Sequence, residues 1–289
     1  MLTVRKAYAE DFEKIYPLLL EINNKRITKA GWQRIFRNHW NAEEDYFGYV
    51  LVDQQEILGF MSTIFSKRVI DGQLHNFCNL STWIVKEEAR NKSLLLVSPI
   101  LQLTNYTFTM FTLAGKLEVI WEKFGFKRLN SSYKLLLPLP SITGSFLAKK
   151  GLITFDHRVI ERHLTATELA IFHDHARYNC AFSFIRSDNG NCLIILRRII
   201  RKGLPFVYIH YLSNKEVFSR YINVLRLTIM RQLKVLGIAV QERHLANNIN
   251  IPHTISLSSD QCYNEYYKSD RLAPHQIDDL YSELFLLDV

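Results

Sequence analysis

The stretch of sequence that decides the fold runs from Leu80 to Phe126, and it opens with the strand-like residues Leu80-Ser-Thr-Trp-Ile-Val85. A polar turn follows, Lys86-Glu-Glu-Ala-Arg-Asn-Lys-Ser93, and leads into an apolar helix that starts at Leu94. A second strand at 106–112 precedes a helix that ends in Ile120-Trp-Glu-Lys-Phe-Gly-Phe126. A strand that turns through a basic loop into a helix presents free backbone N–H groups and the positive end of a helix dipole. The stretch therefore predicts a binding site for a pyrophosphate just after Val85.

The order and spacing of these pieces resemble the acyl-CoA-binding core of the GNAT acyltransferase superfamily. In that family the turn after the central strand has the pattern R/Q-x-x-G-x-G/A, and the aligned residues here are Arg90-Asn-Lys-Ser-Leu-Leu95. The arginine is kept, whereas Ser93 and Leu95 replace the two glycines that let the family's backbone approach the cofactor. A second signature, aromatic-Tyr-Glu-x-x-Gly-Phe, corresponds to residues 120–126, with Trp121 in place of the tyrosine. An indole is not a usable acid, so general acid catalysis is not expected from this position.

The resemblance implies which residues form the site. Those expected to hold acetyl-CoA or another acyl-CoA, largely through backbone N–H groups, are Ile84, Val85, Arg90, Asn91, Lys92, Ser93, Leu94 and Leu95. The catalytic candidates are Asn79 and Ser81 on the central strand, and His75, placed just before it as the nearest base. The alternative, which the residue type alone favours, is that His75 is an ordinary surface histidine. None of these residues is a carboxylate, and acyl transfer without a dedicated base requires a site that mainly orients the reactants.

The remaining sequence alternates strand and helix patterns in both halves of the chain. The first half predicts strands at 2–7, 46–52, 57–69, 76–85 and 133–137, and helices at 10–22 and 29–40. Asp71-Gly72 is a hairpin signal, and Pro17 should kink or interrupt the first helix. The second half predicts helices at 165–177 and 215–236, the latter stopped by Gly237, and strands at 181–187, 192–200, 206–212 and 238–243. This order repeats that of residues 46–112, which indicates a diverged internal duplication.

The predicted fold is therefore α/β (α+β), with two GNAT-like lobes that each consist of a twisted mixed β-sheet flanked by helices. The expected domains are residues 1–140, which bind acyl-CoA, and residues 141–289, a degenerate copy, with a boundary in the proline-rich stretch 138–144. The central strand and its successor should splay apart to leave a slot for pantetheine. The degenerate lobe lacks a glycine in its own loop, Asn214-Lys-Glu-Val-Phe-Ser219, and is not expected to bind the cofactor.

The predicted function is transfer of an acetyl or acyl group from acyl-CoA to an amine or hydroxyl of a small-molecule acceptor, with an amino sugar as one candidate. The alternative is a non-catalytic GNAT-like protein that binds acyl-CoA or a metabolite and has a regulatory role. The aromatic residues Trp32, Phe36 and Trp40 are read as the buried face of a helix, or else as a wall of the acceptor site. A homodimer is left open as an assembly. No metal is expected, because His173 and His175 are two apart on a helix and point to different faces.

Composition limits the other classes. The chain has 289 residues, of which 48% are hydrophobic and 22% charged, so a packed core is expected rather than disorder. No apolar run approaches the ~18 residues of a membrane span, and the N-terminus lacks the features of a signal peptide. We therefore expect a soluble, cytoplasmic protein with its four cysteines reduced. The net charge of +8 is scattered over short clusters, which makes a nucleic-acid partner unlikely.

Overall fold

The computed structural model describes residues 1–289 except 41, 114–116, 140–151, 247–250, 258–263 and 289. The described chain forms two compact units, residues 1–129 with 264–289, and residues 130–263. Each unit is built on a mixed seven-stranded sheet flanked by helices, which confirms the predicted fold class. The predicted boundary after residue 140 lies outside the described residues. The units differ from the expected division because the last part of the chain returns to the first sheet.

The sheet of the first unit has the strand order β1-β2-β3-β4-β5-β14-β6. Neighbouring strands are antiparallel except β4 and β5, which are parallel. A tight turn joins β3 to β4, with positive φ at Asp71 and Gly72, as the hairpin signal predicts. The strands of this sheet are β1 (Leu2–Lys6), β2 (Gly48–Asp53), β3 (Glu56–Ile70), β4 (Gln73–Val85), β5 (Tyr106–Leu113), β14 (Asn264–Lys268) and β6 (Lys127–Arg128).

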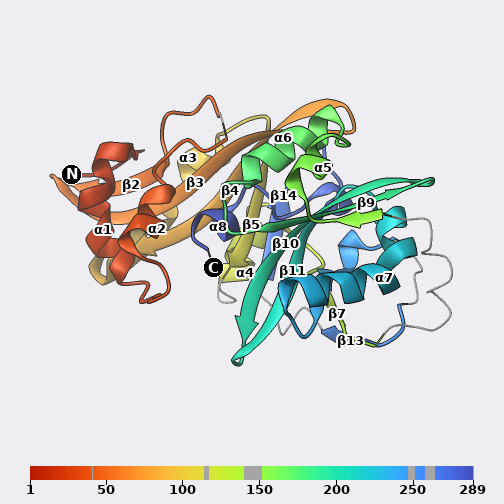
Figure 1. Ribbon diagram of the computed structural model, residues 1–289. Helices are drawn as coiled ribbons and strands as arrows, with labels where there is room; N and C mark the ends of the chain where they lie inside the picture. Colours follow the sequence, from red (N-terminus) through yellow and green to blue (C-terminus); the bar gives the residue numbers. More distant parts are fainter. Residues whose placement is uncertain (41, 114–116, 140–151, 247–250, 258–263, 289) are drawn as a thin grey trace. The chain divides into compact units, whose positions relative to one another are not determined.

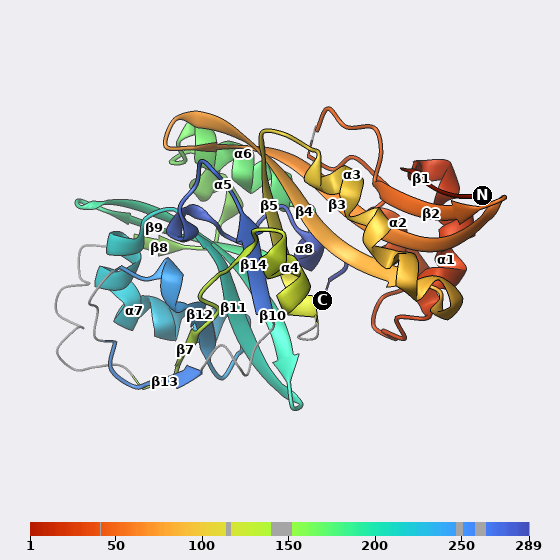
Figure 2. The same cartoon turned by 180° about the vertical axis from the view of Figure 1, so that it is seen from behind.

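Helices cover both faces of this sheet (Figures 1 and 2). On one face lie α1 (Phe12–Leu20) and α2 (Lys29–Arg34), since the Phe36 ring just after α2 stacks on Phe60 of β3. Met61, the next residue of β3, points to the opposite face because side chains alternate along a strand. There it shares a buried cluster with Leu96 and Val97. That second face therefore carries the 3₁₀ helix η2 (Glu87–Leu96) and the short helix α3 (Ser98–Leu101), together with α4 (Glu118–Lys123).

The sheet of the second unit has the order β13-β7-β12-β11-β10-β9-β8, with one parallel pair, β11 and β12. The two sheets thus have the same succession of strand directions, as the predicted duplication requires. Each sheet also takes one strand from the other half of the sequence, β14 in the first and β7 in the second. The strands are β7 (Tyr133–Leu136), β8 (Leu152–Thr154), β9 (Ala181–Ser187), β10 (Gly190–Arg201), β11 (Leu204–Leu212), β12 (Ile238–Gln241) and β13 (Thr254–Leu257). The helices are α5 (His157–Glu161), α6 (Ala166–His175) and α7 (Lys215–Leu233).

Several predicted element bounds were wrong. α1 continues through Pro17 to Leu20, without the predicted interruption. The predicted polar turn at 86–93 is helical, because η2 already begins at Glu87. α7 ends at Leu233 and not just before Gly237, and the next residue, Lys234, adopts the left-handed conformation with φ of 52°. The second predicted helix stops at Arg34, so Trp40 is reached through turns beyond it.

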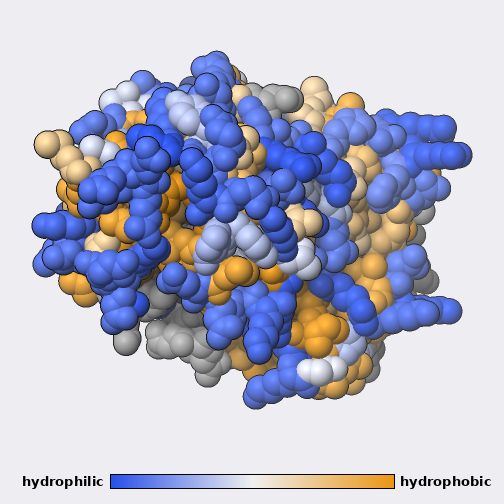
Figure 3. All heavy atoms as spheres, turned by 90° about the vertical axis from the view of Figure 1, so that its left-hand side faces the viewer, coloured by the Kyte–Doolittle hydropathy of each residue, from blue (hydrophilic) through white to orange (hydrophobic). Residues whose placement is uncertain are grey.

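The surface that carries α1 and α2 mixes hydrophilic side chains with smaller hydrophobic areas (Figure 3). Within the described part of the chain, no helix has both the length and the apolar character needed to cross a membrane.

Candidate functional site

The first unit contains a fork where β5 leaves β4. The parallel pairing of these strands covers Asn76 to Asn79 on β4 and Tyr106 to Thr109 on β5, and it stops there. On its other side β4 stays paired with β3 as far as Val85. Among the described residues, no strand therefore pairs with the backbone of residues 80–85 on the side of the fork, which is the predicted splay.

Asn79 holds the two strands together at the point of divergence. Its Nδ2 donates to the carbonyl oxygen of Thr109 at 3.3 Å and to Thr109 Oγ1 at 3.2 Å. Its Oδ1 accepts from the backbone N–H of Glu283 at 3.2 Å. Asn79 is 1% exposed, so its amide is committed to these contacts. The structure thus places this predicted catalytic residue at the fork, in a position to orient its neighbours.

Glu283 is a feature of the fork that the sequence did not predict. It begins α8 (Glu283–Leu286), which lies beside β4 and β5 in both views (Figures 1 and 2). Its Oε1 accepts a hydrogen bond from Thr112 Oγ1 at 2.9 Å, while its buried Oε2 has no partner among the described residues. Burial of the side chain raises the pKa of Glu283 to about 7, against the hydrogen bond from Thr112. A carboxyl group is therefore present at the fork, although β4 itself carries none.

The other two catalytic candidates lie apart from each other. Ser81 is half-buried and follows the fork, next to an irregularity in the β3–β4 register between Met61 and Thr63. His75 is inside β4, not before it, and pairs in register with Arg68. The two side chains are six positions apart, which is roughly 20 Å along an extended strand. The structure therefore brings Asn79 and Ser81 to the fork and places His75 at the far end of the strand.

The segment predicted to hold the cofactor leaves β4 directly after the fork. Lys86, the residue before η2, makes no side-chain hydrogen bond to the helix start and instead pairs with Glu56. The first helical turn carries two acids, which do not favour an anion there, but the exposed cations Arg90 and Lys92 follow within a few residues. Among the described residues, neither cation has a hydrogen-bond or ion-pair partner, so both are available to an anionic ligand.

Leu95 replaces a family glycine, yet its side chain does not point toward the fork. It is 44% exposed and lines a hollow with β1 residues, including Val4 and Arg5, and with Gln102. β1 is an edge strand, and β2, β3 and β4 lie between it and β5. Ser93 is half-buried, while Asn91 and Leu94 are exposed. The bulky leucine therefore leaves the space after Val85 to the backbone.

Two tryptophans meet on the η2 face of the fork. The rings of Trp83 on β4 and Trp121 on α4 are 5.5 Å apart in an edge-to-face arrangement. Trp121 is 1% exposed and also packs edge-to-face on Phe126. Both indole N–H groups are buried and have no acceptor in the described part of the protein. One of these buried donors, that of Trp83, thus belongs to the segment of β4 that follows the fork.

In the second unit, the start of the helix that follows the corresponding strand is capped. α7 follows β11 as η2 follows β4, and its N-terminal residue is Lys215. Asn214 caps this helix, because its side chain accepts from the backbone N–H of Val217 at 3.0 Å. A donor that a phosphate would use is thus already bonded within the protein.

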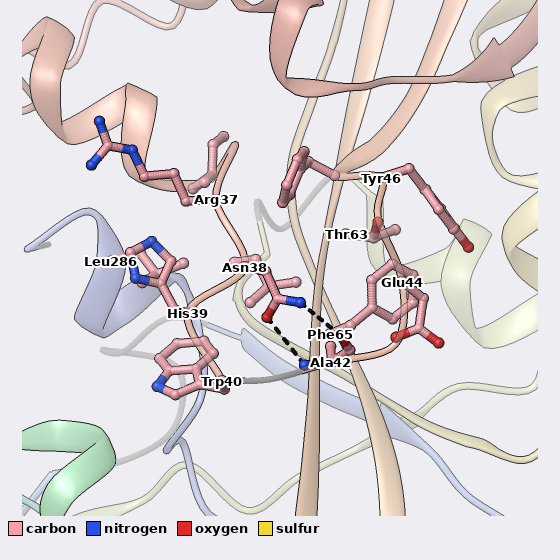
Figure 4. A pocket seen from close by; sticks show the side chains of 13 residues that line it. Arg37, Asn38, His39, Trp40, Ala42, Glu44, Tyr46, Thr63, Phe65 and Leu286 are labelled. Carbon is pink, nitrogen blue, oxygen red and sulfur yellow. Dashed lines mark hydrogen bonds between the residues drawn. The ribbon is translucent and has the colours of Figure 1, made fainter.

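A small pocket lies on the first unit where residues 37–40 and 42–47 meet β3 (Figure 4). Asn38 organises this segment, since its side chain bonds both the N–H and the carbonyl oxygen of Ala42. Thr63 lines the pocket, and its buried hydroxyl has no partner among the described residues. Trp32, Phe36 and Trp40 are all at most 4% exposed, as expected for a buried face, although Trp40 also lines this pocket.

The remaining candidates from the sequence are histidines and cysteines. Across the described residues, no group of histidines, cysteines and acids is arranged to hold a metal ion. His175 is buried and bonds the carbonyl oxygen of Ile171, while His173 lies 3.9 Å from Glu161. Cys78, Cys180 and Cys192 are free thiols, and Cys262 lies outside the described residues.

The fold resembles solved GNAT structures over nearly the whole chain. A conserved protein from Enterococcus faecalis V583, described as a probable N-acyltransferase, matches with a TM-score of 0.62 at 10% identity, over 95% of this chain and 74% of that one. A GCN5-related N-acetyltransferase from Anabaena variabilis matches with a TM-score of 0.56 at 11% identity, over 93% of this chain and 72% of that one. Another from Kribbella flavida matches with a TM-score of 0.58 at 10% identity, over 93% of this chain and 72% of that one. No protein-family model matches the sequence, and neither does any curated protein. The chain has the GNAT fold in a two-unit form, as the sequence resemblance predicts.

Proposed function

We propose that this protein transfers an acetyl or other acyl group from acyl-CoA to an amine or hydroxyl of a small-molecule acceptor, for which an amino sugar is one candidate. The observation that carries the proposal is the fork between β4 and β5, followed directly by an uncapped helix start and two free cations. A pantetheine arm needs an unpaired strand edge, and a diphosphate needs free N–H groups and positive charge. Both lie within fifteen residues of Asn79 in this chain.

The proposed cofactor residues divide by role. Ile84 and Val85 would bond the pantetheine amides through their backbone. Residues 90–95 lie inside η2, where backbone N–H groups bond within the helix, so they would bind the diphosphate mainly through the charges of Arg90 and Lys92. The backbone N–H groups available to the diphosphate would be those of the first residues of η2. The indole N–H of the half-buried Trp83 supports the same placement, because a carbonyl of the acyl or pantetheine part would give it the acceptor that it lacks among the described residues.

Removing the two free cations should weaken binding of acetyl-CoA without unfolding the protein. By isothermal titration calorimetry we expect Arg90→Ala/Lys92→Ala to bind acetyl-CoA about tenfold more weakly than the wild type, or ~1.4 kcal/mol, since both side chains are exposed and screened. Lys25→Ala/Arg26→Ala is the matched control, because it removes the same charge from the exposed loop between α1 and α2, on the other face of the sheet. Equal weakening by both variants would mean that only net charge matters and that the loop after β4 is not the site.

A non-catalytic acyl-CoA-binding protein is the second candidate. The loss of both family glycines and the presence of Trp121 where the family has tyrosine favour it. Release of free thiol from acetyl-CoA in the presence of primary amines and amino sugars separates the two functions. Binding with thiol release supports the enzyme, and binding with no release for any acceptor supports the non-catalytic protein.

A further inference from the structure

We propose that Thr112 and Glu283 form a proton relay at the fork, through which the acceptor loses a proton to the Glu283 carboxylate. The inference rests on the proposed function and assigns a proton acceptor that the sequence of the central strand does not supply. It concerns only residues of the first unit.

The geometry of the relay starts at the surface of the fork and runs inward. Thr112 is partly exposed and lies on β5 three residues beyond Thr109, the last residue of β5 paired with β4. Its hydroxyl donates to Glu283 Oε1 at 2.9 Å, so a proton that reaches Thr112 can be passed on as the hydroxyl proton moves inward. Glu283 is 1% exposed and cannot meet an acceptor molecule directly. Thr112 is therefore the group that meets the acceptor.

The carboxylate is held in one place by the same residue that closes the fork. Asn79 Oδ1 accepts from the Glu283 backbone N–H, and Asn79 Nδ2 bonds Thr109, so β4, β5 and α8 are fixed to one another. Glu283 Oε2 has no hydrogen-bond partner among the described residues, and no cation pairs with the side chain there. Such an unpaired buried carboxylate accepts a proton more readily than a surface glutamate does.

The step balances for an amine acceptor. The ammonium form gives one proton to Thr112 Oγ1 while the Thr112 hydroxyl proton passes to Glu283 Oε1. The lone pair of the free amine then attacks the thioester carbonyl carbon, so that the C–N bond forms and the C–S bond breaks. Coenzyme A leaves as the thiolate with the bonding electron pair, and the second nitrogen proton goes to the thiolate or to water. Nothing is oxidised or reduced.

The surrounding charges do not supply an alternative partner. Asp278 is held by Arg68 of β3 through two hydrogen bonds of 2.7 and 2.5 Å, and Arg34 of α2 donates to the carbonyl oxygen of Leu286. The other buried titratable groups on the surrounding elements are Asp279 and Tyr281 on the same segment, His75 and Cys78 on β4, and Glu265, Tyr266 and Tyr267 on β14. Within the described chain, none of these groups forms an ion pair or hydrogen bond with the Glu283 side chain.

The test compares Glu283→Gln and Thr112→Val with Thr109→Val in the full chain. Thr109→Val removes a fork hydroxyl that bonds Asn79 but does not reach Glu283. With acetyl-CoA and a panel of primary amines that includes glucosamine, we expect Glu283→Gln and Thr112→Val to lower kcat by at least 100-fold, in the range of general base catalysis. Thr109→Val should lower it less than tenfold. In the wild type kcat should rise with pH through about 7, and in Glu283→Gln this limb should disappear.

Calorimetry with acetyl-CoA on the same variants separates the two proposals. If the wild type and Glu283→Gln bind acetyl-CoA equally and only the wild type turns over, the relay is supported. If Glu283→Gln keeps its turnover within tenfold, or keeps the pH limb, the relay is overturned while the proposed function stands. If the wild type binds acetyl-CoA but acylates none of the amines, the relay is overturned in favour of the non-catalytic function. If the wild type does not bind acetyl-CoA, both proposals fall.

Discussion

Replacing Trp121 with alanine will destabilise the first unit by about 3–5 kcal/mol, the usual cost of deleting a buried large aromatic side chain. Trp121 is 1% exposed and its ring packs edge-to-face on both Trp83 and Phe126. No neighbour can refill a space of that size without moving, because these rings also contact the sheet. The loss should appear as a lower midpoint of urea unfolding.

Tryptophan fluorescence follows this transition selectively, because all four tryptophans of the chain lie in the first unit. Trp121→Phe is the control. It keeps an aromatic ring and removes an indole N–H that is buried without an acceptor, so two effects of opposite sign partly cancel. We expect it to cost less than half as much as the alanine variant. An alanine variant as stable as the phenylalanine variant would mean that this ring is not part of a packed core.

Glu283→Gln will gain stability over the wild type as the pH rises. The difference in free energy of unfolding between the variant and the wild type should be about 3 kcal/mol larger at pH 8 than at pH 4. Burial raises the pKa of Glu283 from its ordinary 4.5 to about 7, so the folded state binds the proton more tightly than the unfolded state. The protonated form keeps its full stability below pH 4.5, and that contribution is lost as the pH rises through about 7. The difference between the folded and the unfolded pKa of Glu283 corresponds to roughly 3 kcal/mol of unfolding free energy, at about 1.36 kcal/mol for each pKa unit. Glutamine is never charged and does not suffer this loss.

The measurement is urea unfolding of both proteins between pH 4 and 9. Thr112→Val is a useful companion, because the hydrogen bond from Thr112 holds the pKa of Glu283 down. In Thr112→Val the loss of stability with rising pH should therefore extend to higher pH than in the wild type. If the difference between Glu283→Gln and the wild type is the same at every pH, then Glu283 is not a buried carboxyl with a raised pKa.

Much of the first sheet could be predicted because local patterns decide it. The alternation along 57–69 and 76–85 and the Asp71-Gly72 turn define β3 and β4, and the stretch 80–126 gives the following crossover. The resemblance to GNAT proteins then predicts the splay between β4 and β5, which the pairing confirms. Such features depend on residues close in sequence, so a pattern within one window suffices.

Other features depend on contacts between distant parts of the chain. Asn79 and Glu283 are separated by 204 residues, and nothing near Leu280 distinguishes a carboxylate that will be buried at the fork from one on a helix surface. The position of β14 between β5 and β6 also depends on a contact between distant parts of the chain. Leu95 shows a third limit, since its identity predicts crowding near the cofactor while its direction toward β1 depends on how η2 crosses the sheet.

The central claim is that acyl-CoA binds in the fork between β4 and β5 and at the start of η2. Hydrogen–deuterium exchange with and without acetyl-CoA tests it most directly, because it reads the backbone N–H groups that the claim invokes. We predict slower exchange for peptides covering residues 80–96, with little change in residues 214–219 of the second unit. Unchanged exchange across 80–96 at saturating acetyl-CoA, or protection confined to the second unit, would contradict the account.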